Sequence, residues 1–348
     1  MSAYATGTAA TTKVVTLARR PHAEPQPDDF AVVEVPVPTL ADGQVLVRNA
    51  FMSVDPSMRG RLEETEKHYT TNFQVGQPLD GSAVGLVVQS ADRSVPVGAY
   101  VRHRLGWREL AVVDAAAANV VDQAIAPLSQ WLGVLGQTGF TAYVGLVRAA
   151  ELRPGDSVFV SAAAGAVGTA AAQFARLLGS SRVVGSAGGE RKTSLLIDEL
   201  GLDGAVDYRS EPVREGLERV APEGIDVYFD NVGGDHLVAA LDALRIGGRV
   251  ALCGMISQFD ATSPRPSIDH LILAVLKRVT LRGFIVRDHE DLRPEFEERV
   301  GDWLRSGELV SKQTVADGIE GAVAAFLGML HGGNVGKMLV RLDPTLAE

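Results

Sequence analysis

Cysteine is the residue that this sequence has least of. Cys253 is the single cysteine among 348 residues. One thiol excludes a disulfide within the chain and a zinc site built on several cysteines. It is also typical of proteins that work in a reducing compartment, so we expect a cytoplasmic protein.

Positive charge is also scarce, since 33 Lys and Arg residues stand against 43 Asp and Glu and the formal net charge is -10. Nucleic acids and anionic membranes attract basic surfaces, so neither is an expected partner. No stretch reaches the roughly 20 apolar residues of a membrane-spanning helix. Residues 1–12 are rich in Ala and Thr and lack the basic start and apolar run of a signal peptide, which predicts a disordered tail.

Two further motifs are missing. The seven histidines are scattered rather than placed at the spacing of metal ligands, so we expect no bound metal. The sequence also lacks the G-x-S-x-G turn that presents a nucleophilic serine, so hydrolase chemistry has no support.

Two patterns of secondary structure divide the chain. Up to about residue 132, short β-type stretches (31–37, 44–47, 83–89 and 100–103) are separated by turns, which is typical of a small β-barrel. From residue 133, strands alternate with helices as in βαβ units on a parallel sheet. We expect strands at 157–161, 182–186, 226–229, 249–253 and 279–285, and helices at 166–178, 190–200 and 235–244. After about residue 307 shorter mixed elements return, ending in a strand at 337–341.

A Gly- and Ala-rich turn connects the strand at 157–161 to the helix that follows it. Ala163, Gly165 and Gly168 occupy the three glycine positions of the G-x-G-x-x-G fingerprint. Gly165 would let the backbone approach a pyrophosphate, and Gly168 would let the helix pack closely on its strand. The motif predicts dinucleotide binding, and the alternative is a turn that serves packing alone.

The end of the next strand bears on which dinucleotide binds. NAD sites usually place an Asp or Glu there, whereas this strand ends in Ser186 and is followed by small residues. Lys192 or Arg191 could neutralise a 2′-phosphate, which favours NADP. Two alternatives stay open: Glu190 could favour NAD, and the two basic residues could be solvated members of a first helical turn.

Three other residues are candidates for the site. Asn231 follows a strand and could bind the cofactor or shape the turn before Gly233. Cys253 follows another strand, and we expect it to be a small buried apolar residue rather than a nucleophile. Tyr69 could donate a proton, although a tyrosine in a polar loop often packs on the surface.

Six segments together resemble the medium-chain dehydrogenase/reductase superfamily, and within it the zinc-independent, NADPH-dependent reductases of alkenals and 2-alkenones. That branch includes prostaglandin, plant double-bond and curcumin reductases. The resemblance runs from about residue 45 to residue 341, and its segments are 52–61, 139–143, 162–168, 229–234, 253–254 and 333–337. It implies an α/β fold in which a Rossmann doubly wound parallel sheet (133–306) is inserted into a GroES-like β-barrel domain (13–132 and 307–348), and it implies a homodimer.

The resemblance also implies site residues. It assigns the pyrophosphate of NADP(H) to Gly165, Ala166, Val167 and Gly168, and the 2′-phosphate to Lys192 and Tyr208. Further cofactor contacts are implied at Asn231, Cys253, Gly254, Ile256, Ser257, Phe284, Ile285, Val286 and Asn334.

The substrate side departs from the family pattern. Ser57 and Phe259 stand where the family commonly has tyrosines near the substrate, so Tyr69 becomes the leading phenol, with Ser57 as the second catalytic candidate. The function that the resemblance implies is reduction of the carbon–carbon double bond of a small enone or enal, with hydride transfer to the β-carbon. Two alternatives remain: a quinone reductase of the same superfamily, and a non-catalytic sensor that binds NADPH.

Overall fold

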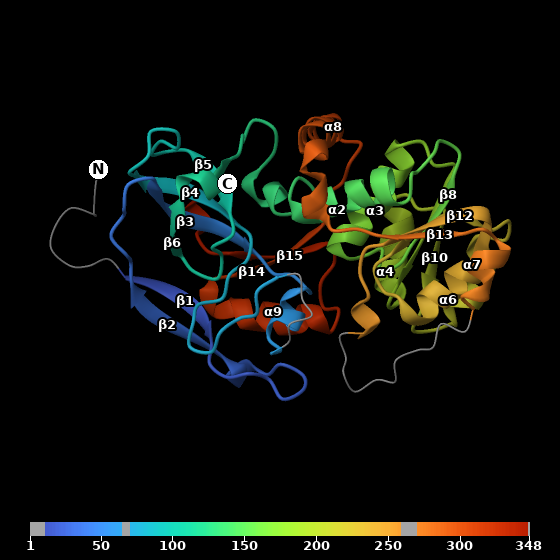
Figure 1. Ribbon diagram of the computed structural model, residues 1–348, viewed down its shortest axis with the longest axis horizontal. Helices are drawn as coiled ribbons and strands as arrows, with labels where there is room; N and C mark the ends of the chain where they lie inside the picture. Colours follow the sequence, from blue (N-terminus) through green and yellow to red (C-terminus); the bar gives the residue numbers. More distant parts are fainter. Residues whose placement is uncertain (1–10, 65–69, 259–269, 347–348) are drawn as a thin grey trace. The chain divides into compact units, whose positions relative to one another are not determined.

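The structure, a computed structural model, describes residues 11–64, 70–258 and 270–346 and divides into two compact units (Figure 1). The β unit comprises Met1–Leu132, Thr314–Asn334 and Met338–Glu348, and the α/β unit comprises Gly133–Gln313 and Val335–Lys337.

The β unit is built on antiparallel strand pairing. β1 pairs with β2, and a second sheet has the order β14-β15-β3-β4-β5-β7, in which β6 also pairs with β3. Its strands are β1 (Thr11–Leu17), β2 (Phe30–Pro36), β3 (Gln44–Ser53), β4 (Ala83–Ser90), β5 (Tyr100–His103), β6 (Leu110–Asp114), β7 (Asn119–Val120), β14 (Gln313–Asp317) and β15 (Lys337–Arg341). Its helices are α1 (Met58–Arg61) and α9 (Ala322–Leu330), and its 3-10 turns are η1 (Pro27–Asp29), η2 (Ala115–Ala117), η3 (Leu128–Trp131), η7 (Ile319–Gly321) and η8 (Pro344–Leu346).

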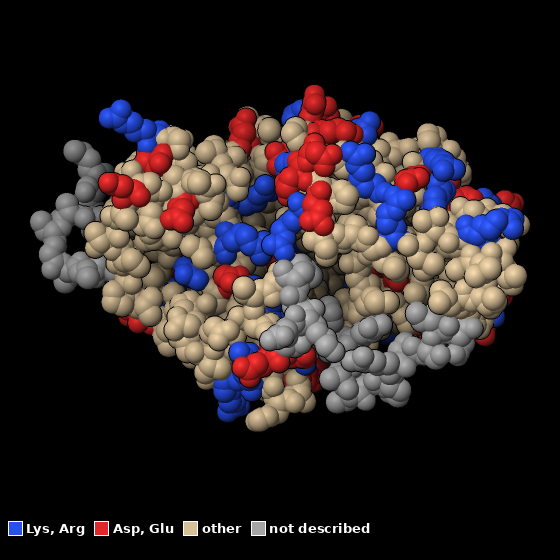
Figure 2. Space-filling view, in the orientation of Figure 1, with Lys and Arg blue, Asp and Glu red and all other residues tan. Residues whose placement is uncertain are grey.

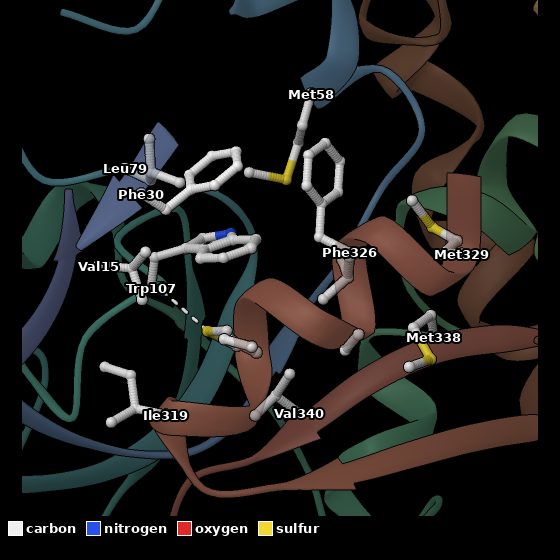
Figure 3. Close-up of a cluster of buried hydrophobic side chains, with 14 of the residues drawn as sticks. Val15, Phe30, Met58, Leu79, Trp107, Ile319, Phe326, Met329, Met338 and Val340 are labelled. Carbon is white, nitrogen blue, oxygen red and sulfur yellow. Dashed lines mark hydrogen bonds between the residues drawn. The ribbon is translucent and has the colours of Figure 1, made fainter. Parts of the chain in front are cut away.

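An aromatic and methionine-rich core joins α9 to the strands of this unit (Figure 3). Trp107 is fully buried and lies edge-on to Phe326 of α9, with ring centroids 6.2 Å apart. The backbone N–H of Trp107 donates to the Sδ atom of Met52 at 3.1 Å. Because Phe326 belongs to the last part of the chain, this core holds the C-terminal segment against the N-terminal strands.

The α/β unit contains a six-stranded sheet with the order β10-β9-β8-β11-β12-β13, and all of its strand pairs are parallel. Its strands are β8 (Ser157–Val160), β9 (Arg182–Ala187), β10 (Gly204–Asp207), β11 (Ile225–Asp230), β12 (Leu244–Leu252) and β13 (Thr280–Gly283). Its helices are α2 (Gln137–Val144), α3 (Ala166–Leu177), α4 (Glu190–Asp198), α5 (Val213–Val220), α6 (Gly234–Ala243), α7 (Ile272–Leu276) and α8 (Arg293–Ser306), with shorter turns η4 (Gly145–Ala149), η5 (Ile256–Gln258) and η6 (Val286–Leu292).

Counted along the chain, this order is 3-2-1-4-5-6, which is the order of a Rossmann sheet. The central strand β8 is buried at all four residues, because a strand in the middle of a parallel sheet is covered on both faces and needs consecutive apolar side chains. The edge strand β13 is largely exposed. The order reverses between β8 and β11, and ligands of open α/β sheets bind at that point, beyond the carboxyl ends of the strands.

Two predicted boundaries are wrong. Thr11 and Thr12, expected in the disordered tail, belong to β1, where these β-branched residues pair with Pro36 and Val35. Residues 307–313, expected in the β-barrel domain, belong to the α/β unit. The side-chain amide of Gln173 explains the second difference, since it donates to the carbonyl of Val310 and accepts from its N–H, at 3.0 and 2.9 Å.

Several predicted elements differ at their ends. The helix expected at 190–200 stops at Asp198, and the helix expected at 235–244 runs from Gly234 to Ala243. The strand expected at 249–253 begins five residues earlier, at Leu244, where it pairs with Ile225 of β11. The strand expected at 279–285 is shorter, spanning Thr280–Gly283.

Candidate cofactor site

The turn between β8 and α3 has the tight geometry that the fingerprint requires. Ala162 has a φ of 48°, and the N–H of Gly165 closes the turn by donating to the Ala162 carbonyl at 2.9 Å. A Cβ atom at Gly168 would lie 2.2 Å from the same carbonyl oxygen, so only glycine fits there. Gly168 therefore allows α3 to start directly against the turn.

Ala163 takes the place of the first glycine of the fingerprint, and the structure shows how it is accommodated. Its methyl group is fully buried and lies beside Gly185 of β9, where an added Cβ would come within 2.6 Å of it. Gly185 thus leaves the space that Ala163 occupies. The departure from the motif is compensated on the neighbouring strand.

The N-terminus of α3 suits an anion. Gly165 is its N-cap residue and supplies no side chain to cap it, and the first backbone bond of the helix runs from Thr169 N–H to Gly165 O. The N–H groups of Ala166, Val167 and Gly168 therefore lack acceptors within the helix, and the helix dipole adds positive potential there. A pyrophosphate fits this end of the helix.

A segment from the far end of the chain supports this turn. The N–H of Gly336 donates to the carbonyl of Ala164 at 2.8 Å, and Gly336 forms a β-bridge with Gly165. Gly336 has a φ of 63°, and a Cβ there would lie 1.9 Å from the Lys312 carbonyl. The sequence alone did not identify Gly336 as a site residue, although Gly336 lies two residues after Asn334 in the segment 333–337.

Beyond β9 the chain presents small and basic residues. β9 ends at Ala187, and a Cβ at Gly188 would lie 2.7 Å from the phenol oxygen of Tyr208. The Tyr208 ring packs edge-on to His236, 5.5 Å away. Burial lowers the pKa of Lys192, and the charges of Arg209 and Arg191 lower it further. The structure therefore brings Lys192 and Tyr208 to the same strand end.

Asn231, just beyond β11, is held by a buried network at the reversal of the sheet. Its backbone N–H donates to the Ser161 hydroxyl at 2.9 Å, and its side-chain NH₂ donates to the Ser161 carbonyl at 2.8 Å. The fully buried Asp230 accepts bonds from Tyr228 O–H and from the N–H of Gly233, both at 2.7 Å. The sequence did not identify Ser161 or Tyr228 as site residues, because only the fold brings Ser161 to Asn231 and Tyr228 to Ser161.

Burial also raises the pKa values of the acidic groups in this network and beside it. It raises the pKa of Asp230 and of Tyr228, and it raises the pKa of Cys253 to about 12, with the Asp230 carboxylate adding to that last effect. Cys253, which is half-buried, is therefore a protonated thiol at neutral pH, and a protonated thiol is a poor nucleophile.

The loop after β12 lies against the loop after β11. The N–H groups of Cys253 and Gly254 donate to the Asp230 carbonyl at 2.9 and 3.0 Å, and Ser257 donates to the Val232 carbonyl. Ile256 is exposed beside them. The predicted residues Cys253, Gly254, Ile256 and Ser257 therefore lie with Asn231 beyond the carboxyl ends of β11 and β12.

Phe284 to Val286 follow β13, the next strand of the sheet. The ring of Phe284 reaches Gly145, where an added Cβ would lie 2.9 Å from it. Ile285 is 38% exposed, and Val286 begins η6. These residues stand beyond the carboxyl end of the strand that neighbours β12.

The predicted substrate residues are only partly described. Ser57 is exposed and precedes α1 in the β unit, whereas Tyr69 and Phe259 lie outside the described residues. In the same motif, Arg61 binds Asp80 with two bonds of 2.5 and 2.7 Å and stacks on Phe73. The contacts of Arg61 therefore indicate a structural role in the segment 52–61.

The described part of the chain offers neither a metal site nor a membrane-spanning helix. Residues 11–64, 70–258 and 270–346 contain no group of three His, Cys, Asp or Glu residues that could hold a metal ion. The same ranges include no helix both long and apolar enough to cross a bilayer. Figure 2 shows acidic side chains gathered over α8, on a face where charges of both signs are otherwise interspersed.

The sequence and the fold match known proteins. Residues 13–121 match the family model described as "N-terminal domain of oxidoreductase", and residues 166–304 match "Zinc-binding dehydrogenase". The NADP-dependent 2-alkenal reductase of Nicotiana tabacum is 38% identical over 86% of this chain and 87% of its own. The NADPH-dependent curcumin reductase of Escherichia coli is 36% identical over 94% and 95%.

A solved structure has the same fold as this chain. CurA from Vibrio vulnificus, in complex with NADPH, superposes with a TM-score of 0.89 at 36% identity, over 95% of this chain and 99% of that one. The predicted fold class, a GroES-like domain with a Rossmann sheet, is confirmed. The chain belongs to the medium-chain dehydrogenase/reductase family that contains the 2-alkenal and curcumin reductases.

Proposed function

We propose that this chain is an NADPH-dependent reductase of the carbon–carbon double bond of α,β-unsaturated ketones and aldehydes. Two features together carry the proposal. The N-terminus of α3 has no side-chain cap, and β9 ends in Ser186 and Ala187, where NAD sites usually place an acid, next to basic residues. The names of the tobacco and E. coli relatives support both the cofactor and a conjugated substrate.

The proposed cofactor contacts come from the segments that follow the six strands of the parallel sheet, and Asn334 is added to them. The amides of Gly165 to Gly168 bind the pyrophosphate, and Lys192 with Tyr208 binds the 2′-phosphate. The remaining contacts, which hold and orient the cofactor, are Asn231, Cys253, Gly254, Ile256, Ser257, Phe284, Ile285, Val286 and Asn334. Bound NADPH supplies the hydride for the reaction.

The chain's own catalytic task is to manage the substrate's oxygen and one proton. When the β-carbon accepts a hydride, the electron pair of the double bond moves towards the carbonyl oxygen and forms an enolate. Tyr69 and Ser57 are the proposed hydrogen-bond donors to that oxygen, and Tyr69 or water delivers the proton to the α-carbon. Because water can also protonate an enolate, removing the phenol is expected to lower turnover by only about 10–100-fold.

A cofactor-oxidation screen tests this function. NADPH consumption is followed with an enone, an enal and a quinone, and NADH is used in parallel. We expect turnover of the enone and enal with a preference for NADPH, and slower turnover by Tyr69→Phe. Turnover of the quinone alone would show a quinone reductase, binding without any turnover would show a sensor, and a preference for NADH would contradict the role of Lys192.

We also propose a homodimer formed through β13. This strand is the edge of the parallel sheet, and Arg282 and Gly283 are exposed along it. The neighbouring helix α7 exposes three large apolar side chains, Ile272 at 60%, Val275 at 70% and Leu276 at 61%. An open strand edge beside an apolar helix favours pairing with a second copy, which would cover both.

A further inference from the structure

A third cation stands at the end of β9 that the proposed function uses. β10 pairs in parallel with β9, with Asp207 opposite Ala187, so the residues that follow β10 lie beside the turn that follows β9. Those residues are Tyr208 and Arg209, and the turn is formed by Gly188 and Gly189. Arg209 is exposed and was not among the residues singled out from the sequence.

Gly188 shows how close Arg209 comes to this turn. A Cβ built on Gly188 would lie 2.7 Å from the phenol oxygen of Tyr208 and 2.8 Å from Nε of Arg209. A phenol donor and a guanidinium donor therefore converge on one point beside the backbone. Hydroxyl and guanidinium donors placed together in this way suit a phosphate group.

The charge of Arg209 is poorly balanced by its surroundings. Within the described residues its guanidinium makes no hydrogen bond or ion pair, whereas Arg219 binds Glu211 and Arg176 binds Asp203 at 2.7 Å. Asp207 directs its Oδ1 atom to the backbone N–H groups of Gly189 and Arg209. Of the influences on the lowered pKa of Asp207, the charge of Arg209 is the weakest.

Like charges are also concentrated here. Arg209 and Arg191 both lower the pKa of Lys192, after burial, and Arg209 does so more than Arg191. Three cations around one glycine turn repel each other, as the lowered pKa of Lys192 reflects. A bound phosphate would offset that repulsion and return the pKa of Lys192 upward.

We infer that Arg209 binds the 2′-phosphate of NADPH together with Lys192 and Tyr208, and is a residue that determines the preference for NADPH over NADH. The inference rests on the proposed NADPH-dependent function. It adds a side chain that can donate two hydrogen bonds to the phosphate. Lys192 supplies a compact positive charge, Tyr208 supplies a hydroxyl donor, and Arg209 supplies a planar guanidinium with paired N–H donors.

Two nucleotide fragments isolate this contact from catalysis. Calorimetric titration of 2′,5′-ADP measures binding with the 2′-phosphate, and titration of 5′-AMP measures binding without it. Arg209→Met should weaken 2′,5′-ADP about 10-fold and change 5′-AMP by less than about twofold, as expected for the loss of a charge-assisted hydrogen bond. Arg209→Lys, which keeps the charge but loses the planar pair of donors, should weaken 2′,5′-ADP by about threefold, less than Arg209→Met.

The matched control is Arg305→Met, which removes an exposed arginine of α8 that binds Asp302. It should leave both titrations unchanged. If the wild type binds the two fragments equally, the NADPH preference itself is wrong. If the wild type prefers 2′,5′-ADP and Arg209→Met keeps that preference in full, the proposed function stands and the role of Arg209 is overturned.

Discussion

In the turn between β8 and α3, the space available to each side chain decides which residue type fits. The methyl group of Ala163 fits because Gly185 on β9 has no Cβ atom. Gly168 likewise leaves room for the carbonyl oxygen of Ala162. Protein interiors are close-packed, so even one added methyl must displace its neighbours. At the scale of single residues, the shape of the turn between β8 and α3 depends on which residues lack a Cβ atom.

Gly168→Ala should therefore damage both folding and cofactor binding. The new methyl would lie 2.2 Å from the Ala162 carbonyl oxygen, so the turn must open. We expect a loss of about 1–3 kcal/mol in the free energy of unfolding, measured by urea denaturation, and weaker NADPH binding. Gly328→Ala is the control, because no atom lies within 4 Å of its added Cβ and alanine favours a helix. Equal behaviour of the two variants would contradict the steric argument.

Among the elements, β13 and α7 differ from the rest of the α/β unit. β8 and β11 are covered on both sides, whereas β13 has an open edge and α7 has no buried residue. A short helix with exposed Val275 and Leu276 is poorly stabilised as a monomer. These elements therefore support the proposed contact with a second copy.

Val275→Asp should separate that dimer. Burying a carboxylate in an apolar interface is costly, so we expect the dissociation constant to rise at least about 100-fold, with a monomer at micromolar concentration in light scattering. Ile197→Asp, on α4 at the opposite side of the sheet and 46% exposed, serves as the control and should remain dimeric. A wild-type monomer, or a Val275→Asp dimer of unchanged strength, would contradict the proposal.

For the whole molecule, buried histidines limit stability in acid. His103 is buried in the β unit, where it bonds Asn49 at 2.9 Å, and His236 is buried in α6. Burial lowers the pKa of His103 to about 3 and that of His236 to about 4. Because the unfolded chain binds these protons near pH 6.5, stability is present in full above that pH and falls as the pH drops towards 4 and 3.

Unfolding in urea at pH 7.5 and pH 5 measures this effect. Each histidine is expected to cost about 2 kcal/mol at pH 5 relative to pH 7.5. Asp230 acts in the opposite direction, since its raised pKa makes its protonation easier in the folded state. His103→Gln should show a shallower dependence on pH than the wild type. An identical dependence in both proteins would exclude His103 as a cause.

By itself, the sequence determined what short-range sterics and periodicity encode. The strand at β8, the turn through Gly168 and the helix α3 follow from residues within about ten positions of each other, so they could be predicted. β10, α5 and α8 were not predicted, because their short apolar patterns do not stand out without the neighbours that bury them. The resemblance supplied Tyr208 and Asn334, which local pattern alone does not identify.

Only the tertiary structure decided which distant residues meet. Gly336 supports the turn at Ala164, Tyr228 and Ser161 hold Asn231, and Arg209 reaches Gly188 because β10 pairs with β9. Such contacts arise from strand pairing and chain return, which leave no periodic signal in a single sequence. Cys253 illustrates both contributions. As the single cysteine it excludes a disulfide within the chain, and its half-buried position near Asp230 in the fold keeps it a protonated thiol.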